Sequence, residues 1–306
     1  MKPCSPWVQS NSAKPRKGSA GFSGTEERST FKTTGKKKIM DSAQINNLAA
    51  RMKLTALTTG AWRATRLHRK ETGIVNAAHH TTDAAKVHVK LTNSPALTAL
   101  NKLHAEAYDA HRTLTLPSIQ DGLRLLPAGR ELQHSQKMHE FATQHEKLKA
   151  QFIAEYADEK ASAPIRLNGL YDPAHWPSEY TVAAKFSFRT RYLACPAMGE
   201  WGEWIRESAD AAEAELLERL TECLQRVADR CGEPEGKLYQ TVFGNLAEVV
   251  ALVPDLNFNA NPKIATAAKA AQELAALNAE TIRDAKAARR EAADKAAGIL
   301  AALGKQ

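Results

Sequence analysis

The segment that most restricts the fold is "NSPALTALNKLHAEAYDAHRTL", which has the features of a long helix packed along one side. Ser94 can accept the hydrogen bond of a helix N-cap, and Pro95 stands in the first turn, where a missing N–H costs nothing. Small and leucine side chains then recur at spacings of four and three, at Ala96, Leu100, Leu103, Ala107, Ala110 and Leu114. The spacing predicts a helix over 94–114 that packs on another long element.

That element is expected in the next periodic segment. Residues 130–161 carry a helical stripe of mostly apolar side chains at Met138, Phe141, His145, Leu148, Phe152 and Tyr156. The two segments are separated by the break "TLPSIQDGLRLLPAG". Two long helices joined by a compact loop indicate an antiparallel helical hairpin.

Three short segments have the pattern of half-buried strands. "AKVHVKLT" and "VAAKFSFRTRYLAC" alternate apolar and basic residues, and "KLTALTTGAWRATRLHRK" is rich in Thr, with a Gly in the middle. Strands around 54–64, 86–92 and 184–193 are predicted to pair into one small sheet, with a short helical piece at 74–85 between the first two. Only one side of a strand can face the core. We therefore expect Phe186, Phe188 and Tyr192 to be buried and Lys185, Arg189 and Arg191 to be exposed.

The C-terminal part is helical throughout. A helix is predicted over 203–230, and "KLYQTVFGNLAEVVALV" is an apolar helix expected to stop at Pro254. Asn261-Pro262 then starts an Ala-rich helix of about forty residues. Its small side chains must pack closely on a neighbouring element or on a second copy of the chain. The predicted fold class is mostly α with a small antiparallel β element (α+β), containing a long helical hairpin and a long Ala-rich C-terminal helix.

The predicted organisation has three parts, because the charge is unevenly distributed. The net charge is +8, yet residues 1–40 hold nine Lys and Arg against Glu26 and Glu27, which gives +7. This basic leader has too few apolar groups to fold and is expected to be disordered. Met40 is an alternative start, in which case the leader is upstream sequence. Residues 41–200 form the helical hairpin with the small sheet, and residues 201–304 form the C-terminal helical region.

Composition also restricts the location. No apolar run approaches the roughly 20 residues of a membrane-spanning helix, and no apolar signal segment follows Met1. We therefore expect a cytoplasmic protein with no membrane partner. The four cysteines form no C-x-x-C pair and are expected to be reduced.

Signatures of catalysis are weak. The sequence has no Walker loop, no dinucleotide fingerprint and no G-x-S-x-G string, so no cofactor, catalytic residue or small-molecule substrate is identified. Nine of the ten histidines lie between His68 and His145, and Glu131-x-x-His134 has the i,i+3 spacing of di-iron bundles. Such a site needs a second pair, so no metal is predicted. His104 and His111 are expected to face His139 or His145 across the hairpin, at the edge of the packed stripe between the two helices. The chain is predicted to be non-enzymatic.

Basic residues are the strongest candidates for function. The segment 51–70 holds six Lys and Arg around Trp62 and no carboxylate. If the predicted strands pair with their apolar sides inward, their outer side is a cationic surface suited to DNA or RNA. The candidate nucleic-acid-binding residues are Arg63, Arg66, Arg69, Lys70, Lys86, Lys90, Lys185, Arg189 and Arg191. The alternative is that these are only the solvated side of ordinary strands.

Four motifs in order resemble a widespread family of uncharacterised bacteriophage and prophage proteins. They are "HRTLTLPSIQDGLRLLP", "RLNGLYDPAHWPSEYTVAAKFSF", "LVPDLNFNANPKI" and the early "GAWRATRLHRKE". "TLPS" lacks the tryptophan that the family usually has after the proline, and "DPAHWP" replaces a tyrosine-proline pair. The resemblance implies a phage or prophage origin and transfers no site. Two functions remain open: a helical adaptor or assembly protein that binds itself or a phage or host protein, and a sequence-independent nucleic-acid-binding protein of a replication or recombination module.

Overall fold

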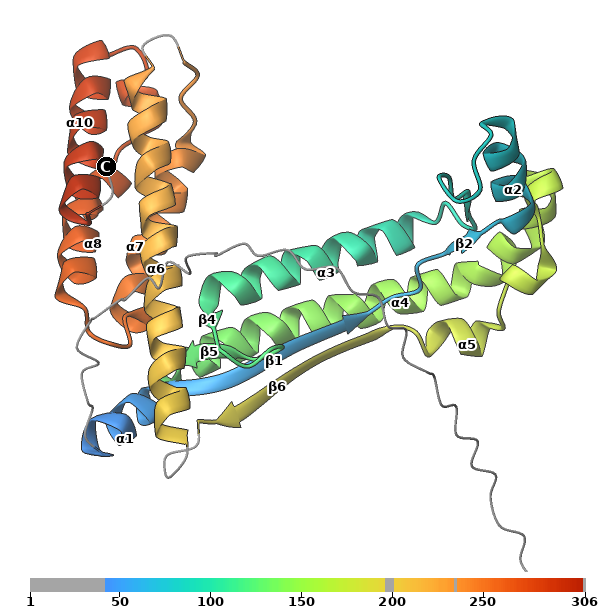
Figure 1. Cartoon of the computed structure of the whole chain (residues 1–306), viewed down its shortest axis with the longest axis horizontal. Coiled ribbons are helices and arrows are strands. Elements are labelled where there is room, and N and C mark those ends of the chain that lie inside the picture. Colours follow the sequence, from blue (N-terminus) through green and yellow to red (C-terminus); the bar gives the residue numbers. More distant parts are fainter. Residues whose placement is uncertain (1–41, 196–200, 234–235, 305–306) are drawn as a thin grey trace, which may run out of the picture. The chain divides into compact units, whose positions relative to one another are not determined.

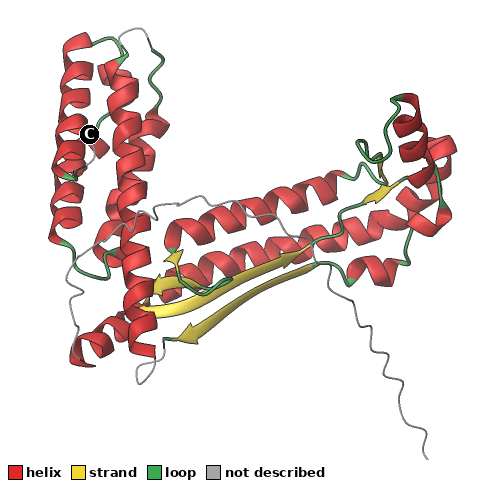
Figure 2. Ribbon diagram, viewed as in Figure 1, coloured by secondary structure: helices red, strands yellow, loops and turns green. Residues whose placement is uncertain are grey.

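The computed structural model describes residues 42–195, 201–233 and 236–304. Within these residues the chain is mostly α-helical with two small antiparallel sheets (Figures 1 and 2), which confirms the predicted fold class. The predicted basic leader and the alternative start at Met40 lie outside the described residues.

The helical hairpin is confirmed. Helix α3 spans Pro95–Leu114 and begins as predicted, because the Ser94 hydroxyl accepts a hydrogen bond from the backbone N–H of Leu97. Helix α4 spans Glu131–Leu167 and lies along α3 (Figure 1). It continues beyond the expected end at residue 161 and includes Pro164 in its last turns. Ala96, Leu100, Leu103 and Ala107 of the predicted stripe are buried, and Ala110 and Leu114 are half-buried, so the spacing of four and three did identify the packed side of the helix.

The main sheet differs from the prediction in its strands. Its order is β4-β5-β1-β6, and every pair is antiparallel. Strand β1 (Met52–Gly60) pairs with β6 (Ser187–Ala194), from Lys53 opposite Ala194 to Gly60 opposite Ser187. The other two strands, β4 (Leu116–Pro117) and β5 (Arg124–Pro127), come from the segment interpreted as a break between the long helices. Leu125 and Leu126 of β5 are fully buried, so this short apolar segment is a core strand.

The third predicted strand belongs to another sheet, so a single sheet formed by 54–64, 86–92 and 184–193 is wrong. Strand β3 (His88–Lys90) pairs only with β2 (Thr65–Leu67) in the described structure. The predicted strand at 54–64 ends at Gly60, where an added Cβ would lie 2.7 Å from the Ser187 hydroxyl and 2.9 Å from the Lys185 carbonyl. A short segment that includes Ala64, at a positive φ of 50°, then leads into β2.

Helix α2 also lies elsewhere than predicted, over Arg69–Ala78 in place of 74–85. The loop that follows is shaped by the buried Asn76. Its side-chain oxygen accepts hydrogen bonds from the backbone N–H of Ala85, at 2.8 Å, and from the Thr81 hydroxyl, at 3.0 Å. These hydrogen bonds pair polar groups of the loop with the Asn76 side chain, so residues 79–85 are held in place without forming a helix.

The C-terminal region is a bundle of helices. It contains α6 (Trp201–Gly232), α7 (Gln240–Leu256), α8 (Pro262–Ala275), α9 (Ala279–Ile282) and α10 (Lys286–Ala302). The smaller helices α1 (Ser42–Arg51) and α5 (Glu179–Ala183) complete the fold. Pro254 lies inside the last turn of α7, so the predicted stop at Pro254 is two residues early.

The single Ala-rich helix of the prediction is wrong, because the chain reverses after α8. The turn is held by Gln240 of α7, whose side chain accepts from the N–H of Ala279 at 2.8 Å and donates to the carbonyl of Leu277 at 3.2 Å. Asn278 caps α9. Ala267, Ala268 and Ala271 of α8 and Ala292 and Ala296 of α10 are buried against the chain's own helices, whereas other small residues of these helices, among them Ala270 and Gly298, are exposed.

Candidate functional site

A basic groove of about 1050 Å³ lies where the two sheets meet. Its walls come from the end of β1, from β2, from the first turn of α2 and from the segment that enters β6. Five of the nine predicted nucleic-acid-binding residues line it: Arg63, Arg66, Arg69, Lys70 and Lys185. All five side chains are exposed. We call this feature the cationic groove.

Local packing places these side chains together. Trp62 is buried against the rings of Phe152, Tyr156 and Trp176, with centroid distances of 6.0, 5.6 and 6.3 Å. This anchor directs the neighbouring Arg63 outward. Because Trp62 is only 3% exposed, it cannot serve as a stacking platform for a base.

The close approach at Gly60 brings the second part of the groove into position. Because Gly60 has no Cβ, the end of β1 can lie directly against Ser187 and the carbonyl of Lys185. Lys185 thereby joins the arginines of a segment more than a hundred residues earlier in the chain. This contact is tertiary, and the local pattern of residues carries no sign of it.

The charge of the groove is strongly unbalanced. Asp172 is the only carboxylate among its described lining residues. That carboxylate accepts a hydrogen bond from the N–H of Ala174 at 2.9 Å and lies 3.5 Å from Nε2 of His175. In the described part of the chain, none of the five cationic side chains forms an ion pair or a hydrogen bond. Among the described lining residues, five cationic side chains therefore stand against one carboxylate, and water and salt screen the remaining charge.

The other four predicted residues lie outside the groove. Arg189 and Arg191 are exposed on β6, opposite Thr58 and Ala56 of β1. Lys90 is exposed on β3, and Lys86 is exposed just before that strand. The predicted single cationic sheet is wrong because β3 and β6 belong to different sheets.

The prediction for residues 184–193 is confirmed for the three basic side chains and for Phe186, and only in part for Phe188 and Tyr192. Phe186 is buried, Phe188 and Tyr192 are half-buried, and Lys185, Arg189 and Arg191 are exposed. Phe188 lies against the rings of His104 and His145, which belong to the helical hairpin. Since side chains alternate along a strand, the two arginines project from the side of β6 that faces away from the hairpin.

The helical hairpin contains a layer of buried histidines that sequence analysis only partly anticipated. Nε2 of His104 lies 2.8 Å from Nδ1 of His145, and Nδ1 of His111 lies 2.8 Å from Nε2 of His134. Nδ1 of His134 also lies 2.8 Å from the Tyr192 hydroxyl. His104 does face His145 as predicted, whereas His111 faces His134. His139, the other expected partner, is exposed.

Burial keeps these histidines neutral. It lowers the pKa of His104 to about 4, with a further contribution from His145. The pKa of His111 falls to about 3, through burial and then the nearby His134 and Arg124. Burial also lowers the pKa of His134 to about 4. Each nitrogen pair is therefore a hydrogen bond between neutral rings, with one ring donating and the other accepting. Within the described residues, no group of three or more His, Cys, Asp or Glu is arranged to hold a metal ion.

The described cysteines are unsuited to nucleophilic chemistry. Cys195, Cys223 and Cys231 are free and buried. Burial raises the pKa of Cys195 to about 11 and raises the pKa of the other two thiols as well. They stay protonated and are weak nucleophiles at neutral pH. Cys4 lies outside the described residues.

Comparisons with known proteins return nothing. No protein-family model matches the sequence, and no curated protein or solved structure matches it either. The resemblance to phage proteins therefore stays a prediction. None of the helices in the described ranges is long and apolar enough to cross a membrane.

Proposed function

We propose that this protein binds nucleic acid without sequence preference, through the cationic groove. The observation that carries the proposal is the convergence, within the described residues, of five unpaired cationic side chains on one groove, where the single carboxylate of the described lining already contacts Ala174 and His175. Neutralising phosphates with Lys and Arg releases counterions and supplies most of the affinity of sequence-independent binding. The protein acts as a non-enzymatic accessory protein of a bacteriophage or prophage, in the cytoplasm of the host.

Strand β6 extends the binding surface away from the groove. Lys185, Arg189 and Arg191 are all odd-numbered, so along an extended chain they project to the same side. Alternate strand residues are spaced about 6.6 Å apart. Neither β1 nor β6 contains an Asp or Glu, so no carboxylate of these strands competes with phosphate for the three basic side chains. A short oligonucleotide fits in the groove alone, and a longer one also contacts the two arginines.

The test is binding of fluorescent oligonucleotides to the full chain across a salt series. Two contacts are removed in the Arg66→Gln/Arg69→Gln variant. For single strands we expect weaker binding and a slope of log K against log salt that is shallower by about 1.4, or about 0.7 per lost contact. Binding that is independent of salt, or absent at low salt, would refute the proposal.

The control variant removes the same charge elsewhere. Lys147 and Arg290 are exposed, form no ion pair in the described structure and lie outside the groove. Lys147→Gln/Arg290→Gln should leave the salt slope unchanged. If both double variants weaken binding equally, the attraction depends on net charge and the groove is not a site.

A second candidate function is that of an adaptor or assembly protein that binds a second copy or a phage or host protein. It is favoured by an open apolar groove of about 450 Å³ between α8 and α10, whose lining includes Ala270, Gly298, Ile299 and Leu303. An added Cβ at Gly298 meets nothing within 4 Å, so Gly298→Trp would fill this groove. Light scattering should show a dimer for the native chain and for Gly298→Ala, and a monomer for Gly298→Trp. A monomeric native chain would exclude self-association.

A further inference from the structure

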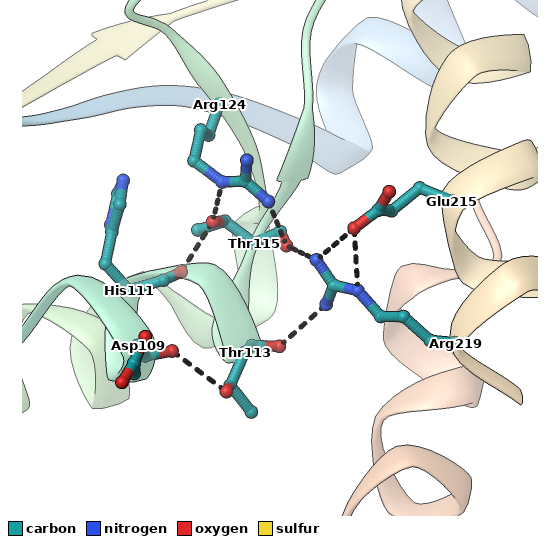
Figure 3. Close-up of polar contacts among 7 residues, drawn as sticks. All are labelled: Asp109, His111, Thr113, Thr115, Arg124, Glu215 and Arg219. Atoms are coloured by element: carbon teal, nitrogen blue, oxygen red, sulfur yellow. Dashed lines mark hydrogen bonds and ion pairs between the residues drawn. The ribbon is translucent and has the colours of Figure 1, made fainter. Parts of the chain in front are cut away.

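A second polar cavity, of about 1080 Å³, lies at the C-terminal end of α3, where β5, α6 and α7 approach it. It shares no lining residue with the cationic groove. Four arginines from three different elements line it: Arg112 of α3, Arg124 of β5, and Arg219 and Arg226 of α6. Figure 3 shows the polar contacts of two of them.

Two of these guanidinium groups share one acceptor. The Thr115 carbonyl accepts a hydrogen bond from Nη2 of Arg124 and another from Nη2 of Arg219, each at 3.1 Å (Figure 3). Nε of Arg124 also donates to the Thr115 hydroxyl at 2.7 Å. Both groups donate to one oxygen atom, so two like charges lie side by side in a partly buried place.

One carboxylate faces these charges. Glu215 contacts Nε of Arg219 at 3.1 Å and Nη2 at 3.0 Å, so it neutralises that arginine. Arg124 bonds only to Thr115, and Arg112 is exposed and forms no ion pair or side-chain hydrogen bond in the described structure. Asp109 also lines the cavity, but its carboxylate is more than 4.0 Å from all three guanidinium groups.

The whole lining holds four arginines and the four carboxylates of Asp109, Glu215, Glu222 and Glu248, and the charge balance is positive only around Arg124. Three cations face one carboxylate and the end of α3, which contributes roughly half a negative charge. The pKa of Arg124 falls to about 10, through burial and then the repulsion of Arg219 and Arg112, opposed by Glu215. Arg219 donates hydrogen bonds to the carbonyls of Thr113 and Thr115 at the C-terminal end of α3, and capping of the helix explains these bonds. It does not explain the unpaired Arg112 or the cavity beside it.

We infer that this cavity binds a small phosphorylated molecule, with the phosphate oxygens held between the guanidinium groups of Arg112, Arg124 and Arg219. Guanidinium groups match phosphate oxygens in charge and in the spacing of their donors. The rest of the lining includes Asn245 and Glu248 of α7 and the ion pair between Glu222 and Arg226, at 3.7 Å. Their oxygens accept hydrogen bonds, so hydroxyl or amino groups on the remainder of the ligand also have partners.

The test uses inorganic phosphate and pyrophosphate as probes of the full chain, with sodium chloride at equal ionic strength as the reference. We expect both probes to raise the midpoint of thermal unfolding above the chloride value, with saturation. Arg112→Gln should weaken the apparent affinity at least tenfold. It should fold normally because the Arg112 side chain is exposed and forms no ion pair or hydrogen bond in the described structure, so it carries the test even if Arg124→Gln does not fold.

Two controls separate this site from other sources of phosphate binding. Arg226→Gln changes another arginine of the same cavity and should alter the affinity less than twofold. Arg66→Gln/Arg69→Gln should leave pyrophosphate binding unchanged, whereas Arg112→Gln should leave oligonucleotide binding unchanged. The inference is overturned if the probes stabilise no more than chloride does, or if Arg112→Gln binds them as tightly as the native chain.

Discussion

Phe186 lies just before β6 and Phe188 lies within it, and the two rings have different surroundings. Phe186 is 5% exposed and packs on Phe152, whereas Phe188 is half-buried near the end of the cluster that contains Leu57 and Met138. Removing a fully buried phenylalanine costs about 3–5 kcal/mol, which includes the cavity left behind. We expect that loss for Phe186→Ala and about half of it for Phe188→Ala. Urea unfolding measures both, and equal losses would contradict the difference in burial.

A single buried arginine connects the helices of the C-terminal bundle. Arg289 of α10 is 3% exposed and donates to the carbonyls of Gly236, at 3.1 Å, and Arg230, at 2.7 Å, and also to that of Glu233. A hydrogen bond to a charged group contributes about 1.5–3 kcal/mol, and water replaces part of each loss here because Arg230 and Glu233 are exposed and Gly236 is half-buried. Arg289→Leu should therefore lower the free energy of unfolding by about 3 kcal/mol or more.

The neighbouring residue provides the matched control for that substitution. Arg290 is exposed, and no ion pair or hydrogen bond of its side chain occurs in the described chain. Arg290→Leu makes the same chemical change on the same helix and should stay within about 0.5 kcal/mol of the native value. A similar loss from both variants would show that the net charge, and not the buried hydrogen bonds, determines the effect.

Helix α7 contains a glycine for which the structure shows no need. An added Cβ at Gly244 would meet nothing within 4 Å, and its φ is not positive. Glycine in a helix interior is less stable than alanine by roughly 0.5–1 kcal/mol. Gly244→Ala should stabilise the protein by about that amount in chemical unfolding. A destabilising effect would mean that α7 has a closer neighbour at this position than the structure describes.

Helices and strands could be predicted from the sequence where apolar residues recur with a regular helical or strand spacing. The start of α3 at Ser94-Pro95, its packed stripe and the alternation of β6 are local patterns, and the structure bears each of them out. Strand β5 contains only four residues and has no period to detect. The reversal after α8 depends on Gln240, which is distant in sequence, while every local alanine favours a continuous helix. The composition of the cationic groove was visible in the basic run at 63–70, but the addition of Lys185 was not.

For the whole molecule, the buried histidines predict sensitivity to acid. In the unfolded chain each histidine has a pKa near 6.5, whereas in the folded chain the pKa values of His104, His111 and His134 are about 4, 3 and 4. Below pH 6.5 the unfolded state binds more protons than the folded state. The free energy of unfolding therefore decreases as the pH is lowered, until the pH reaches the pKa values of the folded state. Each such histidine contributes up to about 1.4 kcal/mol per pH unit.

The measurement is the free energy of unfolding between pH 7 and pH 5, a range chosen because most carboxylates stay ionised in it. His104→Phe/His145→Leu should make the dependence on pH shallower, because two groups that bind protons only on unfolding are removed. His139→Ala changes an exposed histidine of the same helix and should leave the slope unchanged. A flat profile for the native chain would rule out a neutral histidine layer.

The largest hydrophobic cluster joins residues from both ends of the chain. Leu54, Leu116 and Leu125 of the main sheet share it with Ile205 and Leu216 of α6. A peptide containing residues 42–195 and another beginning at residue 201 would each expose apolar surface that only the other covers. The protein should therefore work as a split pair, with two separately produced pieces that are poorly folded alone and reassemble when mixed. Fusing each piece to a different bait would turn that reassembly into a reporter of whether the two baits meet.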